Sequence, residues 1–208
     1  MSEANSGLRS ILKVPFFYDT YQSLVGSHKM RKYITSRYMH FSENCKVLDI
    51  GCGTCELLDF FPNNIQYTGF DKNKECIESA KKRYGTRGNF ICKDVNTIEE
   101  LNLKENEYDL ILLIGVLHHL NDSEVVETLS SAKKLLKQDG YVLSVDGVYL
   151  QQQSGITKYI LSKDRGQHVR FDHEYKRLAE SVFSKTEVFI EKKILRIPTD
   201  YIVMKMFK

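Results

Sequence analysis

The sequence predicts an α/β fold built on a doubly wound, mostly parallel sheet, and three observations support this prediction. Between residues 46 and 149, short apolar runs alternate with segments of helical periodicity. The first apolar run ends in two glycines spaced two apart. Two β-rich runs, 188–194 and 201–207, are separated by a turn and predict antiparallel strands at the sheet edge. The 208 residues suit one domain without internal repeats.

The first predicted strand, 46–50, leaves the sheet through Gly51-Cys52-Gly53. Bare backbone at the two glycines permits a tight turn and lets a ligand approach, with the N–H groups of the next helix facing its polar end. A tight turn without a ligand explains the same residues. The second predicted strand, 65–71, favours a cofactor, because Asp71 lies roughly 20 residues past the first glycine, where an acid can bind ribose hydroxyls. The alternative for Asp71 is a helix cap or turn residue.

A helix is expected over 73–84, with Asn73 as a possible N-cap and Gly85 as its stop. A third strand, 89–92, then leads to Asp94 and a valine. This again places a carboxylate just beyond the carboxyl end of a strand, where open α/β sheets bind ligands.

The longest apolar run, 108–114, predicts a central strand covered on both faces. It leads into Leu-His-His-Leu at 117–120. Asn121 or Asp122 is expected to cap the next helix, Gly140 to end it, and 141–145 to form a fifth strand.

The domain is expected to divide into four parts: a helical cap (1–45), a cofactor-binding core (46–149), an acceptor lid (150–172), and a closing helix with strands (173–208). Aromatic residues crowd the first part, and most of them suit core packing, although Tyr18 or Tyr21 is expected to cover a cofactor. The third part is basic and has weak periodicity, which is typical of a functional loop. Its candidates for binding an anionic group on a substrate are Arg165, His168 and Arg170. A solvated surface loop is the alternative.

Composition excludes several classes of protein. The formal net charge of +3, from 30 basic and 27 acidic residues, is too balanced to predict a nucleic-acid substrate. With 42% hydrophobic residues, no run long enough to span a membrane and no signal-peptide pattern at the start, a cytoplasmic protein is expected. Five cysteines in no regular framework fit reduced thiols.

From about residue 47 to residue 145, these motifs together resemble the class I S-adenosylmethionine-dependent methyltransferases, in the branch of small bacterial-type enzymes. The family's acid-x-Gly-x-Gly loop stands here as Asp49-Ile50-Gly51-Cys52-Gly53, its second-strand acid as Asp71, its third-strand acid as Asp94, and its fourth-strand block as 109–114 running into Leu117-His118-His119. Four elements in this order are far more specific than any one. The resemblance implies a seven-stranded, Rossmann-like sheet with an antiparallel last strand and helices on both faces.

The resemblance also implies S-adenosyl-L-methionine as the cofactor, with S-adenosyl-L-homocysteine as the product. Gly51 and Gly53 approach its methionine part, and Asp49 orients the loop and the amino group. Asp71 holds the ribose hydroxyls. The remaining implied contacts are Asp94 and Val95 at the adenine, the backbone near Ile114 at the methionine ammonium, and the neighbours Cys52 and Lys72. Many members have a third glycine where this chain has Cys55, which puts the tightness of the helix–strand packing in doubt.

The expected acceptor is an unidentified small molecule, with Tyr18 and His118 on its side of the site. His119 is the candidate general base for acceptors that lose a proton. Adjacent histidines point in different directions, so at least one is expected to pack or cap the helix, and the pair is a poor metal site.

Three other functions remain open. An NAD(P)-dependent oxidoreductase would need a third glycine at Glu56, and the chain lacks it. A thioredoxin-like dithiol at Cys52 and Cys55 leaves the downstream acids without a role. A non-catalytic subunit that binds S-adenosylmethionine is the third alternative.

Overall fold

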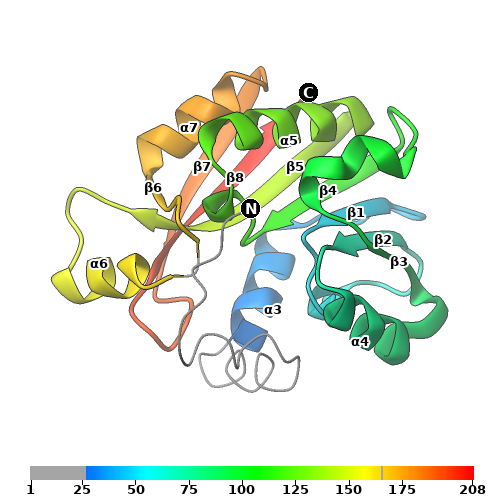
Figure 1. Ribbon diagram of the computed structural model, residues 1–208, viewed down its shortest axis with the longest axis horizontal. Coiled ribbons are helices and arrows are strands. Elements are labelled where there is room, and N and C mark those ends of the chain that lie inside the picture. The colour runs from blue at the N-terminus through cyan, green and yellow to red at the C-terminus, as the bar shows by residue number, and fades with distance from the viewer. Residues whose placement is uncertain (1–26, 165) are drawn as a thin grey trace.

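The protein is described here by a computed structural model that places residues 27–164 and 166–208. A twisted sheet runs through the middle of the molecule in the order β3-β2-β1-β4-β5-β8-β7 (Figure 1). Its strands are β1 (Lys46–Ile50), β2 (Gln66–Asp71), β3 (Gly88–Cys92), β4 (Tyr108–Ile114), β5 (Leu136–Tyr149), β7 (Lys185–Lys192) and β8 (Asp200–Phe207). The two-residue β6 (Arg170–Phe171) pairs with the end of β5.

The strands from β3 to β5 are parallel, and β8 lies antiparallel between β5 and β7. This confirms the predicted doubly wound sheet and the antiparallel last strand. The chain moves outward from β1 to β3 and then returns to the other side of β1 with β4. The order of strands therefore reverses between β1 and β4, and open α/β sheets bind ligands beyond the carboxyl ends of strands at such a point.

Helices cover both faces of the sheet. The helices are α3 (Ser27–Tyr38), α4 (Lys74–Tyr84), α5 (Asp122–Leu135), α6 (Gly155–Ser162) and α7 (Asp172–Glu180), with 3₁₀ turns η1 (Glu56–Phe60), η2 (Gly85–Arg87), η3 (Val95–Leu101) and η4 (Leu117–His119). One core cluster joins α5 and α7 to the sheet, and a second joins α3 and α4 to the opposite face. Figure 1 shows these two layers on either side of the strands.

Strand β4 supplies residues to both cores. Leu110 and Leu112 face the cluster beneath α3 and α4, whereas Ile111 and Leu113 face the cluster beneath α5 and α7. All four side chains are fully buried. Each such burial stabilises the fold by roughly 1.5–3 kcal/mol, so the continuous apolar run makes β4 the central strand, as predicted.

The predicted helix caps are also confirmed. Asn73 Oδ1 accepts hydrogen bonds from the backbone N–H groups of Glu75 and Cys76 at 3.0 and 3.3 Å. At α5, Asn121 and Glu124 form a reciprocal capping box with bonds of 3.0 and 2.8 Å. These short-range bonds satisfy N–H groups that have no partner within the helix.

The prediction that Gly140 ends a helix is wrong. Helix α5 ends at Leu135, and β5 begins at the next residue, so that Gly140 lies inside the strand. A Cβ at this position would lie 2.9 Å from the carbonyl oxygen of Asp109. The glycine thus marks a close approach of β5 to β4, next to an irregularity in their pairing between Tyr108 and Leu110.

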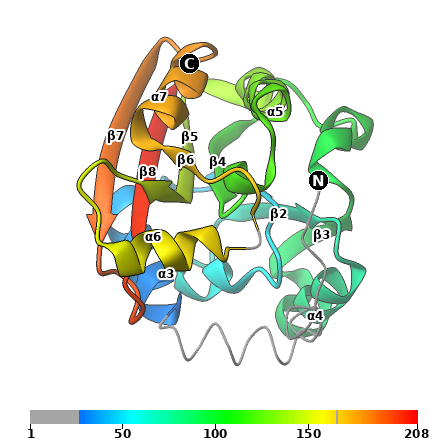
Figure 2. The same ribbon diagram turned by 60° about the vertical axis from the view of Figure 1, so that its left-hand side comes forward.

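The expectation of a functional loop at 150–172 is also wrong in part, because this segment contains α6 and β6 (Figure 2). Ser154 caps α6, with its Oγ accepting from the N–H of Thr157 at 3.1 Å. The large apolar residues Ile156 and Tyr159 are 67% and 65% exposed. The apolar residues of α6 therefore do not mark its buried face, and apolar periodicity did not predict this helix. Among the helices of the described ranges, none is long and apolar enough to cross a membrane.

Candidate functional site

The glycine loop after β1 is held between β2 and the turn after β4. The N–H groups of Gly51 and Cys52 donate to the carbonyl oxygen of Phe70 at 2.9 and 3.1 Å. Gly51 has a φ of +71°, and a Cβ there would lie 2.7 Å from Cγ2 of Val116. Both the backbone conformation and the space therefore require glycine at this position.

Asp71 ends β2 directly beside this loop. Its Oδ2 accepts a hydrogen bond from the N–H of Gly53 at 3.0 Å, and its Oδ1 accepts one from the N–H of Asn73 at 2.8 Å. Asp71 therefore joins the glycine loop to the turn after β2, and its contact with a cofactor stays a prediction. An ionised carboxylate offers about four acceptor positions, and each of its two oxygens accepts one of these bonds.

Asp49 lies beneath the glycine loop and is only 2% exposed. The hydroxyl of Tyr67 donates to its Oδ2 at 2.8 Å. Burial raises the pKa of Asp49 to about 7, with the nearby charge of Asp71 acting in the same direction and the Tyr67 hydrogen bond opposing it. A cation bound above the loop would favour the ionised form of this carboxyl.

The other predicted cofactor residues lie at neighbouring strand ends. Asp94 caps η3 through its Oδ1, which accepts from the N–H of Asn96 at 3.0 Å, and Val95 is buried behind it. Ile114 is half-buried at the end of β4, and Lys72 is exposed beside Asp71.

The cysteines of the loop have distinct environments. Cys52 packs against β2, because a Cβ on Gly69 would lie 3.0 Å from its Sγ. Cys55 is 1% exposed and has a φ of 59°, in the left-handed region that favours glycine. The fold therefore accommodates the Cys55 side chain, while the backbone keeps the conformation that explains a glycine in other members.

The glycine loop, Asp71, Asp94 and the end of β4 thus lie at the carboxyl ends of four adjacent parallel strands. A family model described as a methyltransferase domain matches residues 48–142, which span these strands. Residues 48–142 form a methyltransferase domain. The predicted family is confirmed, and S-adenosylmethionine is the cofactor that goes with it.

Other known proteins resemble this methyltransferase over most of its length. A curated relative, carboxy-S-adenosyl-L-methionine synthase 1 of Yersinia pseudotuberculosis, is 23% identical over 181 residues, covering 84% of this chain and 70% of the relative. A methyltransferase structure from Archaeoglobus fulgidus has a TM-score of 0.71 at 19% identity, covering 92% and 99%. The mitomycin 7-O-methyltransferase MmcR has a TM-score of 0.70 at 21% identity, covering 99% and 62%. At these identities the structural likeness establishes the fold.

In the turn η4, just after β4, His118 lies between two carboxylates. Its Nδ1 is 2.8 Å from Oδ1 of Asp146, and its Nε2 is 3.2 Å from Oδ1 of Asp164. Burial lowers the pKa of His118, but the two carboxylates more than offset this and raise the pKa to about 9. Burial alone would raise the pKa of Asp164, yet the hydrogen bond and charge of His118 lower it to about 2.

His119 lies against His118 instead of pointing away from it. The two ring centroids are 4.2 Å apart and the rings are tilted by 38°. The expectation that these adjacent side chains point in different directions is therefore wrong, because the 3₁₀ turn η4 places both rings on one side. The role of His119 as general base stays a prediction.

The segment after α6 crosses over the His118 turn. The N–H of His168 donates to the carbonyl oxygen of His118 at 3.0 Å. A Cβ on Gly166 would lie 2.1 Å from Cδ2 of His118, so the backbone packs directly on the ring. The predicted lid is thus tied to the end of β4, and the side chain of His168 stays a candidate contact for the acceptor.

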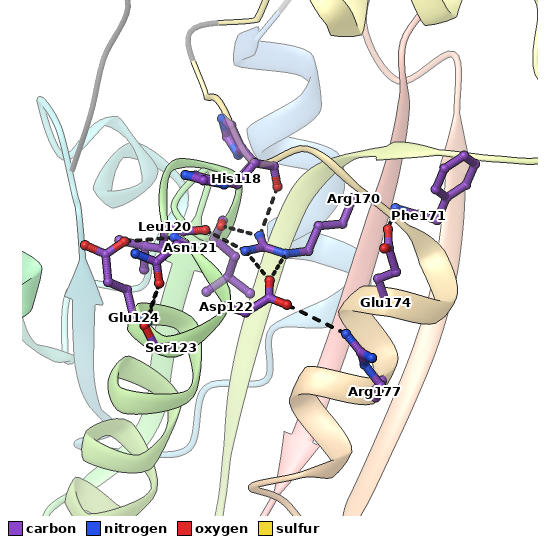
Figure 3. A network of polar contacts seen from close by, with 12 residues as sticks. His118, Leu120, Asn121, Asp122, Ser123, Glu124, Arg170, Phe171, Glu174 and Arg177 are labelled. Atoms are coloured by element: carbon purple, nitrogen blue, oxygen red, sulfur yellow. Dashed lines mark hydrogen bonds and ion pairs between the residues drawn. The ribbon is translucent and has the colours of Figure 1, made fainter.

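Arg170 does not fit the predicted role of binding a substrate anion. Its guanidinium donates to Asp122 Oδ1 at 2.9 Å from Nε, and to the carbonyl oxygens of Leu117, His168 and Leu120 at 3.0, 2.9 and 2.6 Å. With a second contact to Asp122 at 2.8 Å, all five N–H donors have partners (Figure 3). Arg170 therefore holds the lid to the turn after β4, and the earlier expectation is corrected.

Three of the predicted site residues, Tyr18, Tyr21 and Arg165, lie outside the described residues. Sequence reasoning missed Asp146 and Asp164, which contact His118. Asp146 is fully buried within the apolar run of β5. A carboxylate within the mostly apolar stretch 141–149 was the available signal for Asp146, because buried acids are rare unless they are paired.

Proposed function

We propose that this methyltransferase transfers the methyl group of S-adenosylmethionine to a small molecule bound over the carboxyl ends of β4 and β5. The observation that carries this proposal is the position of the polar cluster around His118. It directly follows β4, whose end lies next to the glycine loop. A donor bound at the loop and an acceptor bound at this cluster would therefore be neighbours.

On the donor side, we assign the roles that the family implies. Asp71 accepts hydrogen bonds from the ribose hydroxyls, Asp94 binds the adenine amino group, and Asp49 supports the loop below the methionine end. Each side chain lies at the strand end that this role requires. The bonds from Gly53 and Asn73 hold the Asp71 carboxylate in place before a ligand binds, which reduces the entropic cost of binding.

The methyl transfer itself needs little from the protein besides alignment. The sulfonium carries its own activation, and positioning the acceptor behind the methyl carbon can supply roughly 7–11 kcal/mol. The lid segment covers His118 just beyond the end of β4. The near balance of 30 basic and 27 acidic residues favours a small acceptor over a nucleic acid.

The curated relative supports a second candidate function. Its name describes a synthase that makes a carboxylated S-adenosylmethionine, and it matches 84% of this chain. By that likeness, the product would be a modified cofactor instead of a methylated acceptor. The two functions share the donor site and differ in the product that is released from it.

One assay separates these functions. The purified chain would be incubated with methyl-labelled S-adenosylmethionine and either a small-molecule extract or a macromolecular extract, followed by mass spectrometry. We expect a labelled small product together with S-adenosylhomocysteine, and neither in an Asp71→Ala variant. Label in protein or nucleic acid, or a modified cofactor with no homocysteine product, would contradict the proposal.

A further inference from the structure

We propose that His118, His119 and Asp164 bind one divalent transition-metal ion at the carboxyl end of β4. Each residue offers one ligand atom, and these atoms all lie within 4.8 Å of one another. Two imidazoles and one carboxylate form a ligand set that suits zinc and neighbouring first-row metals. Three protein ligands leave at least one coordination position for another molecule.

The separation of His118 and Asp164 matches a metal site. Ligands about 2.0–2.1 Å from one ion lie roughly 2.8–3.4 Å apart, from octahedral to tetrahedral geometry, and Nε2 of His118 is 3.2 Å from Oδ1 of Asp164. The ring of His119 lies beside that of His118, with centroids 4.2 Å apart. The third ligand is therefore on the same side of the turn.

A buried second carboxylate orients the first ligand. Asp146 is fully buried on β5, and its Oδ1 lies 2.8 Å from Nδ1 of His118. Metal-binding histidines almost always donate the other ring N–H to such a group, which fixes the tautomer and the ring. This contact leaves Nε2 of His118 facing Asp164, which is the orientation that a metal ligand requires.

The backbone holds the ring from the other sides. The N–H of His118 also donates to Asp146 at 3.2 Å, and Gly166 packs on the ring so closely that no Cβ fits there. The N–H of His168 binds the His118 carbonyl group. The position of Nε2 thus depends on β5, on the η4 turn and on the lid, which is typical of a built site. An ion pair without metal uses the same contacts and is the competing explanation.

A role for the ion in catalysis rests on the proposed function. The open position would bind an oxygen of the acceptor and lower the pKa of its hydroxyl. After the hydroxyl proton leaves to water, the oxygen forms a bond to the methyl carbon while the carbon–sulfur bond breaks, and that electron pair stays on sulfur. This favours acceptors with a phenolic, enolic or α-hydroxy-acid oxygen.

The test uses the full chain, treated with a chelator and then titrated with Co²⁺ in the absence of S-adenosylmethionine. We expect one Co²⁺ ion to bind per chain, with the visible d–d absorption bands of cobalt that has nitrogen and oxygen ligands. Asp164→Asn and His119→Gln should each weaken binding at least tenfold, and Asp146→Asn should weaken it roughly 10- to 100-fold. His173→Gln is the matched control, because His173 is 69% exposed on α7 and should leave binding unchanged.

Several results would overturn the inference. These are no binding, binding that survives both ligand substitutions, or the intense near-ultraviolet bands of cobalt bound to thiolates such as those of Cys52 and Cys55. Thermal unfolding of each variant shows whether it is folded. S-adenosylhomocysteine binding, measured on the same samples, tests the proposed function separately, so that either one can fail while the other stands.

Discussion

The backbone N–H of Gly53 donates a hydrogen bond to Oδ2 of Asp71 at 3.0 Å. This bond joins the loop that follows β1 to the acid that ends β2, and these are the two features that a nucleoside cofactor requires together. The carboxylate is thus oriented before the cofactor arrives.

Replacing Asp71 by asparagine should weaken the binding of S-adenosylhomocysteine at least tenfold, because hydrogen bonds to a charged group are worth about 1.5–3 kcal/mol. Isothermal titration calorimetry measures this directly. Asp139→Asn is the matched control, because it also removes one carboxylate but at an exposed position in β5. This variant should leave the affinity unchanged. Equal affinities for the wild type and Asp71→Asn would exclude Asp71 from the cofactor site.

A side chain at Gly51 should destabilise the fold more than one at Gly53. Both positions have positive φ, so each alanine costs about 1–2 kcal/mol of backbone strain. At Gly51 the new Cβ also meets Val116, which adds about 1–3 kcal/mol, whereas nothing lies within 4 Å at Gly53. Urea denaturation measures the difference. Val116→Ala should recover part of the Gly51→Ala loss, and the steric explanation is wrong if it recovers none.

The buried Asp49 makes stability depend on pH. Its folded pKa of about 7 lies above its ordinary value of 3.8, so the folded state binds the proton more tightly and the free energy of unfolding falls as pH rises from 4 to 7. Asp49→Asn removes this contribution, which is on the order of 4 kcal/mol above pH 7. Relative to wild type, the variant should therefore gain stability between pH 4 and pH 8. A pH-independent difference between the two proteins would disprove this account.

Arg170 and Arg177 both approach Asp122, but only Arg170 is buried (Figure 3). Arg170→Gln leaves buried carbonyl oxygens without donors and should lower the free energy of unfolding by about 2–4 kcal/mol. Arg177 is 72% exposed and 3.7 Å from Asp122, so Arg177→Gln should change stability by about 0.5 kcal/mol or less. Chemical denaturation of both variants checks this, and equal effects would contradict the structural role of Arg170.

Features that depend on neighbours in the sequence were predictable. The central strand β4 follows from one continuous apolar run, and the caps at Asn73 and Asn121 follow from a polar residue just before a helical pattern. Asp71 follows from its distance along the chain to the glycine loop.

Features that depend on distant contacts were not predictable. The hydrogen bonds of Arg170 reach carbonyl groups about 50 residues away in the chain, so its sequence context shows only an arginine in a basic segment. The position of Asp164 beside His118 likewise depends on how α6 returns to the sheet. Gly140 was misread because a glycine near a helix end is usually a stop, and only the approach of β4 shows its real constraint.

The central claim is that the glycine loop, Asp71 and Asp94 together bind S-adenosylmethionine. Calorimetric titration of the purified chain with S-adenosylhomocysteine, NAD and NADP tests it most directly. We predict one site for S-adenosylhomocysteine, lost or weakened in Asp71→Asn, and no binding of either dinucleotide. Binding of NAD or NADP without binding of S-adenosylhomocysteine would contradict the account.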